Sequence, residues 1–245
     1  METQQHSPVA LITGGARRVG AAVVRTLHSR GYRIVLHHRA SSADDLAAEL
    51  ELQRPDSVVL VSRDFAEENA ANALAAKAVE AWGRLDVLVN NASTFYPTPV
   101  GEITAEHWDD LMLTNARMPL FLTQACAPAL KQNHGCVVNI IDVHAQRPTR
   151  NHAVYSMAKA ALHTLTLALA RDLAPEVRVN GVAPGAILWA DHEVSSAENQ
   201  AKIDKTALGR MGEPEDIAGA VAYLLEAPYV TGHVLAVDGG RSLNI

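Results

Sequence analysis

The sequence is poor in several features that mark large classes of protein. Its two cysteines, Cys126 and Cys136, are too few for a disulfide framework and fit packing positions in a reducing compartment. The formal net charge of -6 argues against a nucleic-acid-binding surface. No apolar run is long enough to cross a bilayer, and the opening METQQHSP lacks the apolar core of a signal peptide. We therefore expect a cytoplasmic chain with no membrane or nucleic-acid partner.

The chain is long and apolar enough to bury one substantial core. Of its 245 residues 48% are hydrophobic, which fits one large α/β domain covering residues 1–245 better than two small domains. Short β-rich runs alternate with longer helical patterns, which predicts a doubly wound Rossmann-type fold with a seven-stranded parallel sheet. The expected strands are 9–13, 33–37, 57–61, 86–90, 136–141, 177–182 and 234–238, and the expected helices are 19–29, 42–52, 67–82, 106–131, 154–173 and 214–225.

One long stretch, residues 186–209, has no clear periodic pattern. It follows the sixth expected strand, at the edge of the sheet where doubly wound folds bind their ligands. We interpret the stretch as a substrate lid, and an ordinary surface excursion is the alternative.

A glycine turn joins the first expected strand to the first expected helix in the segment LITGGARRVG, residues 11–20. Gly14 and Gly20 bracket this turn, which would direct N–H groups and the positive end of a helix toward a pyrophosphate. Its place at the first strand–helix junction favours dinucleotide binding over a turn that only reverses the chain. Arg18 is unusual, because many such turns carry glycine at that position.

The end of the second expected strand, LHHRASS, favours NADPH over NADH. Chains that bind NAD usually place an acidic side chain there for the ribose hydroxyls, and that charge would repel a 2′-phosphate. Arg39 can instead bind the phosphate through parallel hydrogen bonds, with Ser41 and Ser42 as further donors; a solvated basic loop is the alternative. Asp64, after the third strand, is placed either to cap the adenine amino group or to form a turn.

Later motifs suggest proton transfer beside the cofactor. Tyr155 and Lys159, in YSMAK, lie one helical turn apart, and a neighbouring ammonium is expected to lower the pKa of a phenol from ~10. Asn115 precedes Pro119 by four residues, so its carbonyl loses a helical N–H partner and can hold a water that leads to Lys159, or the helix is simply kinked. The segment NNAS, residues 90–93, would let backbone lie along a cofactor or form a strand-end turn.

Taken together, these motifs resemble the short-chain dehydrogenase/reductase family and span the chain from Thr13 to Gly240. The resemblance implies a Rossmann-type sheet, a nicotinamide cofactor and a tyrosine–lysine proton relay. It also implies a homotetramer in which helices 106–131 and 154–173 pack between subunits. The residues that carry the resemblance are Gly14, Gly20, Asn90, Asn91, Ala92, Asn115, Tyr155, Lys159, Pro184 and Gly185.

Two departures from the family pattern narrow the resemblance. Arg18 replaces the usual glycine, and Asp142, thirteen residues before Tyr155, replaces the usual catalytic serine. With LHHR, NNASTFYPTP, PGAILW and DGGRSL, this pair resembles the pteridine reductases and the related dihydromonapterin and dihydrofolate reductases of the short-chain type. The resemblance implies that Arg18 faces both the cofactor phosphate and the pterin, that Phe95 covers the pterin opposite the nicotinamide, and that Ser93 contacts its polar edge.

The expected site residues fall into three sets, and no metal site is predicted. Catalytic roles are expected for Asn115, Asp142, Tyr155 and Lys159. Contacts with the pterin are expected for Arg18, Ser93, Phe95, Asp142, Tyr155 and Trp189, with Tyr96 as a further pocket residue. Contacts with NADPH are expected for Gly14, Arg18, Val19, His38, Arg39, Ala40, Asp64, Phe65, Asn91, Ala92, Ser93, Tyr155, Lys159, Pro184, Gly185 and Ile187.

Three of these positions have a plainer alternative. Asp142, which we expect to orient Tyr155 or to pass it a proton, can equally be a strand-end residue that caps loop amides. Phe95 can be an aromatic residue that only packs its own loop, and Trp189 can be a hydrophobic plug.

The predicted activity is NADPH-dependent reduction of dihydropterins, with biopterin, monapterin and dihydrofolate forms as candidate substrates. Hydride goes to the carbon of a ring C=N bond, and Tyr155, assisted by Lys159 and Asp142, delivers the proton. One alternative is a short-chain ketone or 3-oxoacyl reductase, against which the missing serine argues. The other is a catalytically silent protein that senses the cofactor, against which intact Tyr155, Lys159 and Asn115 argue.

Overall fold

The computed structural model describes residues 7–40, 42–187 and 196–244, and it confirms the expected α/β architecture. Seven strands form one sheet in the order β3-β2-β1-β4-β5-β6-β7, and every neighbouring pair is parallel. The strands are β1 Val9–Ile12, β2 Arg33–His38, β3 Val58–Ser62, β4 Val87–Asn90, β5 Cys136–Ile140, β6 Arg178–Pro184 and β7 Val234–Val237.

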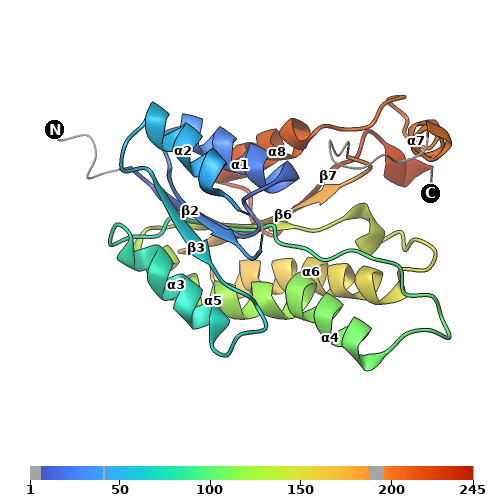
Figure 1. Ribbon diagram of the computed structural model, residues 1–245, viewed down its shortest axis with the longest axis horizontal. Coiled ribbons are helices and arrows are strands. Elements are labelled where there is room, and N and C mark those ends of the chain that lie inside the picture. The colour runs from blue at the N-terminus through green and yellow to red at the C-terminus, as the bar shows by residue number, and fades with distance from the viewer. Residues whose placement is uncertain (1–6, 41, 188–195, 245) are drawn as a thin grey trace.

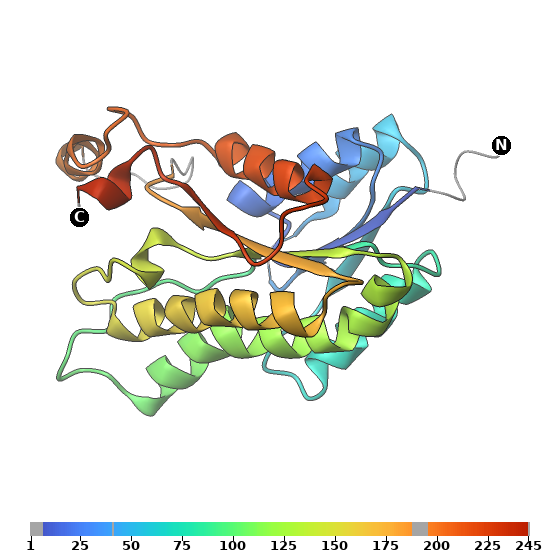
Figure 2. The ribbon, with the colours of Figure 1, turned by 180° about the vertical axis from the view of Figure 1, so that it is seen from behind.

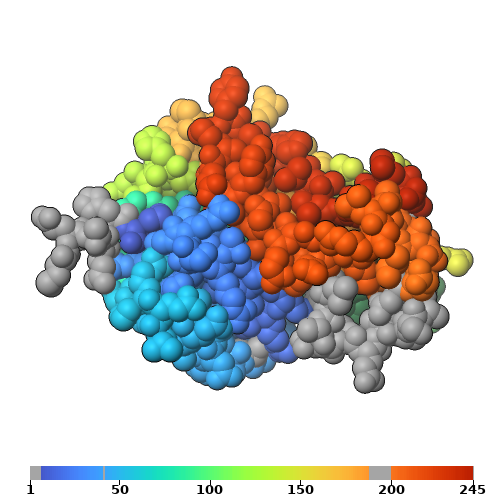
Figure 3. All heavy atoms as spheres, turned by 90° about the horizontal axis from the view of Figure 1, so that it is seen from above, coloured from blue at the N-terminus to red at the C-terminus, as the bar shows by residue number. Residues whose placement is uncertain are grey.

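Helices cover both faces of the sheet, which is why its central strands are mostly apolar (Figures 1 and 2). In β1, Ala10 and Ile12 face one core and Val9 and Leu11 face the other. The first core packs against α1 Arg18–Ser29, α2 Asp44–Gln53 and α8 Pro214–Glu226, and Figure 3 shows this helical layer from above. The second core packs against α3 Ala70–Glu80, α5 Met118–Gln132 and α6 Ala153–Asp172.

The helix expected over residues 106–131 is interrupted. It divides into α4 Ala105–Met112, the π-helical turn η1 Leu113–Arg117 and α5. Thr104 caps the start of α4, and Pro119, near the start of α5, has no N–H to donate to an ordinary α-helical bond. The prediction of one continuous helix was therefore wrong, and Asn115 lies inside the π-helical turn.

The stretch at 186–209 contains a helix that its weak periodicity did not reveal, α7 Ser196–Asp204. Its lid role stays a prediction, and Trp189 lies outside the described residues. Cys126 and Cys136 are both buried, as expected, and burial raises the pKa of their thiols to about 12 and about 11. Within the part of the chain that the structure describes, no helix is both long and apolar enough to cross a membrane.

Candidate active site

The glycine turn after β1 is tied to the segment that follows β4. The Thr13 hydroxyl accepts hydrogen bonds from the N–H groups of Asn91 (2.9 Å) and Ala92 (3.0 Å). The Asn91 side chain donates to the carbonyls of Thr13 (2.9 Å) and Gly14 (3.0 Å). A Cβ on Gly20 would lie 2.1 Å from the Gly14 carbonyl oxygen, so this approach requires glycine. The parallel sheet thus brings Gly14, Asn91 and Ala92 to one edge, as predicted.

The backbone at Arg18 explains why glycine is usual at that position. Arg18 has φ 54°, in the left-handed region, which costs roughly 1 kcal/mol or more for a residue with a Cβ. Glycine would adopt the same backbone without that cost. Strain of this kind persists where the surrounding structure imposes it, which is typical of ligand-binding turns.

The adenosine end of the expected cofactor site lies after β2 and β3. Arg39 and Ala40 are exposed, and the Ser62 hydroxyl donates to the Arg39 carbonyl at 3.2 Å. The Asp64 carboxylate accepts the Ala66 N–H at 2.9 Å, so Asp64 forms the turn that was its alternative interpretation. The ring of Phe65 stacks on His37, with centroids 4.7 Å apart, which fixes one face of that ring.

The centre of the site is a tyrosine bonded to a carboxylate. The Tyr155 hydroxyl, on the first turn of α6, donates to Oδ2 of Asp142 at 2.8 Å. The other carboxylate oxygen, Oδ1, accepts the His144 N–H at 2.8 Å and caps the short helix η2 Val143–Ala145. Asp142 therefore has both of the structural roles considered for it. Oδ1 caps a backbone amide, which fixes the carboxylate, and Oδ2 holds the phenol of Tyr155.

Lys159 is the buried member of this centre. It is 1% exposed, and its ammonium donates to the carbonyl of Ile140, the last residue of β5, at 3.0 Å. Burial lowers the pKa of Lys159 to about 8, and the charge of Asp142 opposes that shift. The ammonium lies 5.7 Å from the centroid of the Tyr155 ring, so it faces the ring from within the protein.

The expectation that the pKa of Tyr155 is lowered was wrong. Burial raises the pKa of Tyr155 well above 10, and the charge and hydrogen bond of Asp142 raise it further, while a hydrogen bond from Ser93 opposes them. The sequence pattern identified Lys159 as a neighbour of Tyr155, but it did not show how deeply Tyr155 is buried. The phenol is therefore protonated at neutral pH and is available as a proton donor.

Asn115 and Ser93 connect the π-helical turn to the loop after β4. The Ser93 hydroxyl donates to Oδ1 of Asn115 at 2.6 Å. The Asn115 amide donates to the carbonyls of Thr94 and Leu111, each at 3.0 Å. The side chain of Asn115 thus positions the loop, whereas the expected water between its carbonyl and Lys159 stays a prediction.

Phe95 is an exposed aromatic residue that contacts the ring of Tyr155. Its ring is 57% exposed, meets the Tyr155 ring edge-on at 4.7 Å and stacks on the His152 ring at 4.5 Å. His152, which sequence reasoning missed, caps α6 three residues before Tyr155. The Tyr96 hydroxyl donates to Asp110 of α4 at 3.0 Å, and Tyr96 packs against the cluster that contains Tyr155. Its contact with a pterin stays a prediction.

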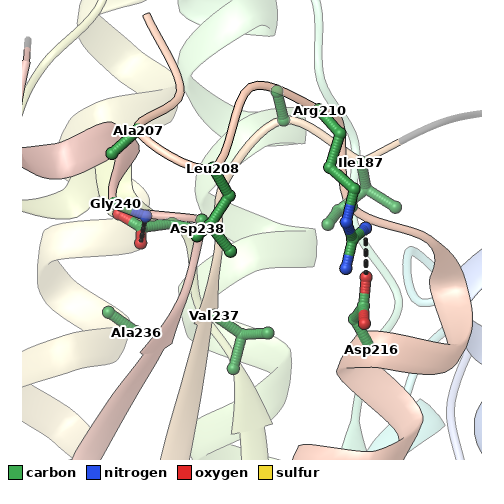
Figure 4. Close-up of a pocket in the computed structure, with 12 residues that line it drawn as sticks. Ile187, Ala207, Leu208, Arg210, Asp216, Ala236, Val237, Asp238 and Gly240 are labelled. Atoms are coloured by element: carbon green, nitrogen blue, oxygen red, sulfur yellow. Dashed lines mark hydrogen bonds and ion pairs between the residues drawn. The ribbon is translucent and has the colours of Figure 1, made fainter. Parts of the chain in front are cut away.

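The carboxyl ends of β6 and β7 lie side by side at the same edge of the sheet. Gly185 donates its N–H to the Val237 carbonyl at 3.1 Å, so Pro184 and Gly185 lie at the carboxyl end of β6 beside β7. Ile187 is buried and lines a cavity of about 370 Å³ together with Leu208 and Val237 (Figure 4). Arg210 and Asp216 form an ion pair at 3.2 Å on the side of this cavity.

Val19 and His38 are partly buried and lie beside the glycine turn. Val19 packs against the first core, and His38 is half-buried at the end of β2. Nδ1 of His38 is buried and has no hydrogen-bond partner among the described residues. The contacts of Val19 and His38 with a cofactor stay a prediction.

Together, the glycine turn, the tyrosine–lysine pair and the parallel sheet define a dinucleotide-dependent oxidoreductase. A family model described as enoyl-(acyl carrier protein) reductase matches residues 14–242. The chain belongs to the short-chain dehydrogenase/reductase family, whose members are oxidoreductases that use a nicotinamide cofactor.

Individual relatives differ in the substrates that their names state. Pteridine reductase 1 of Leishmania tarentolae is 35% identical, over 99% of this chain and 99% of that protein. A protein named as a ketoacyl reductase of the granaticin polyketide synthase in Streptomyces violaceoruber is 37% identical, over 97% of each chain. A 2,3-dihydroxy-2,3-dihydro-p-cumate dehydrogenase of Pseudomonas putida is 33% identical, over 96% of this chain and 94% of that protein.

Proposed function

We propose that the protein reduces dihydropterins with NADPH, transferring hydride to the carbon of a ring C=N bond. The observation that carries this proposal is the 2.8 Å hydrogen bond from Tyr155 to Asp142, at the position where the family usually has serine. A serine hydroxyl can stabilise the oxygen of a ketone, whereas a ring nitrogen that receives hydride at its neighbouring carbon needs a proton. A carboxylate beside the phenol suits the second task.

The residues of the chain divide the chemistry between them. When bound, the nicotinamide supplies the hydride. Tyr155, protonated at neutral pH, gives its proton to the ring nitrogen, and its developing negative charge is stabilised by the Lys159 ammonium. Asp142, bonded to the same hydroxyl, is positioned to return a proton to Tyr155 from solvent.

The shape of the site also suits a flat heterocycle. Phe95 presents an exposed ring beside Tyr155, and a planar pterin can stack on it. Arg18 carries rigid donors for the carbonyl edge of a pterin and positive charge for the pyrophosphate. The left-handed backbone of Arg18 is consistent with a functional turn, because strain of this kind clusters at ligand-binding sites.

Two substrates separate the proposal from its main alternative. The purified protein is mixed with NADPH and either dihydrobiopterin or an acetoacetyl thioester, and loss of NADPH absorbance is followed. We expect turnover of dihydrobiopterin. Turnover of the thioester alone would identify a ketoacyl reductase, an activity that the name of the Streptomyces relative favours. Cofactor binding without turnover of any substrate in a broad panel would identify a cofactor sensor.

The choice of NADPH depends on Arg39. Replacing Arg39 with alanine should weaken NADPH binding about 10- to 100-fold, because charge-assisted hydrogen bonds to a phosphate are worth ~1.5–3 kcal/mol. NADH lacks the 2′-phosphate, so its dissociation constant should change by less than about twofold and serves as the internal control. Fluorescence titration of both cofactors measures the two constants, and equal losses would contradict the phosphate contact.

Arg18 should show opposite effects on stability and on substrate binding. Arg18→Gly should raise the free energy of unfolding by about 0.5 kcal/mol, because glycine relieves the left-handed strain. The same change should raise the KM for dihydropterin about tenfold or more, since a guanidinium contact is lost. Arg17→Gly is the matched control, because Arg17 is extended and gains nothing from glycine. A lower stability with unchanged KM would contradict both roles of Arg18.

We also propose that the protein works as a homotetramer in the cytoplasm. The segments expected between subunits are 106–131, which contains most of α4 and α5, and 154–173, which corresponds to α6. Within them, Leu120 and Phe121 of α5 and Met157 and Leu167 of α6 expose apolar side chains. Apolar side chains gathered on two adjacent helices are typical of surfaces that a further protein chain covers.

A further inference from the structure

His37 connects three segments that surround the adenosine half of the expected cofactor site. Its side chain lies in β2 and is 2% exposed. Nδ1 accepts the N–H of Gly14 in the glycine turn at 3.3 Å, and Nε2 contacts the carbonyl of Arg63 after β3 at 3.0 Å. The ring stacks on Phe65 with an interplanar angle of 7°. The His37 carbonyl also accepts the Gly15 N–H at 3.0 Å, so two successive amides of the turn bond to this one residue.

The partners of the ring determine where its proton lies. The Gly14 N–H can only donate, so Nδ1 must be unprotonated to accept it. The Arg63 carbonyl can only accept, so Nε2 must carry the hydrogen. His37 is therefore neutral with its proton on Nε2, and a second proton on Nδ1 would place two N–H groups against each other.

We propose that His37 is a positioning residue that holds the glycine turn in the conformation that receives the dinucleotide. It acts through the Gly14 amide and does not itself touch the reacting atoms. Because the turn contacts the part of the cofactor that NADH and NADPH share, His37 governs affinity for both cofactors equally, whereas Arg39 distinguishes them. The inference rests on the nicotinamide cofactor of the family and not on the pterin substrate.

The surroundings of His37 keep it neutral over the working range of pH. The pKa of His37 is lowered to about 4, chiefly by burial and also by the neighbouring His38. The Arg63 carbonyl and the charge of Asp64 oppose that shift. As the pH falls toward this value, His37 gains a proton, the Gly14 contact is lost, and affinity for both cofactors should fall together.

Two amide substitutions separate the two sides of the ring. In His37→Asn, the side-chain oxygen can replace Nδ1 and still accept the Gly14 N–H, whereas in His37→Gln the amide reaches the position of Nε2 and can bond only to the Arg63 carbonyl. We expect His37→Gln to weaken NADPH and NADH about fivefold each, and His37→Asn to stay within about twofold of the native constants. Fluorescence titration gives the constants, and thermal unfolding of the ligand-free variants reports their stability.

Each result bears on the proposal. Equal losses in the two variants, a loss confined to NADPH, or unchanged constants in both would overturn it. Nitrogen NMR of the ligand-free native protein gives a second reading, since a His37 ring protonated on Nδ1 at neutral pH would also overturn it. Failure of the protein to reduce pterins would reject the proposed substrate and leave these measurements valid, whereas a native chain that binds neither cofactor would reject both proposals.

Discussion

Replacing Tyr155 with phenylalanine should lower kcat for dihydropterin by ~10²–10⁴-fold, the range expected when a positioned proton donor is removed. The variant keeps the aromatic ring that packs against Phe95 and loses only the hydroxyl that donates to Asp142. The dissociation constant of NADPH should therefore stay within about twofold of the native value, because the ring fills the same space. Steady-state kinetics and cofactor titration measure the two quantities.

The matched control for this change is Tyr96→Phe. The Tyr96 hydroxyl is also bonded to a carboxylate, Asp110, but that pair lies on the α4 side of the same loop. Its loss should leave kcat nearly unchanged. A Tyr155→Phe variant with the native rate, or a Tyr96→Phe variant with an equal loss, would show that the phenol of Tyr155 is not the proton donor.

Asp142→Asn should lower kcat about 100-fold and move the alkaline limb of the pH–rate profile to lower pH. Asparagine can keep the cap on the His144 N–H but cannot accept and return a proton at Tyr155. The negative charge of Asp142 raises the pKa of Lys159, which stands at about 8, so removing that charge lowers the pKa further. The Lys159 ammonium is lost as pH rises through its pKa, and in the variant this loss begins at a lower pH.

Asp110→Asn provides the corresponding control, because Asp110 accepts a tyrosine hydroxyl outside the catalytic centre. Its pH–rate profile should match the native one. An Asp142→Asn variant whose alkaline limb stays in place would mean that Asp142 does not act on Lys159. A native kcat in that variant would remove the carboxylate from the proton path and weaken the argument for a pterin over a ketone.

The glycine turn shows which features of the site local sequence could predict. Thr13, Gly14 and Gly20 predicted a dinucleotide turn, and the structure shows why Gly20 must lack a Cβ. The contribution of His37 could not be predicted, because it depends on the register of β2 against β3 and on the distance between two turns.

The features of the site were also predicted only in part from the sequence. Tyr155 and Lys159 were found from a spacing of four residues, since that spacing sets one face of a helix. The sign of the Tyr155 pKa shift was missed, because burial depends on what α6 packs against. The spacing of Asn115 and Pro119 predicted a lost helical bond or a kink, but not that the break takes the form of a π-helical turn.

By itself, the sequence determined the alternation of strands and helices, the parallel sheet and the residue that we propose as the proton donor. Those features depend on periodicity, on glycine and proline positions and on side-chain chemistry, all of which are local. Only the tertiary structure decided that Asp142 holds Tyr155, that Lys159 is buried beneath it and that His37 braces the glycine turn. These relations join residues from different strands and helices, so they depend on packing distances that no local pattern encodes.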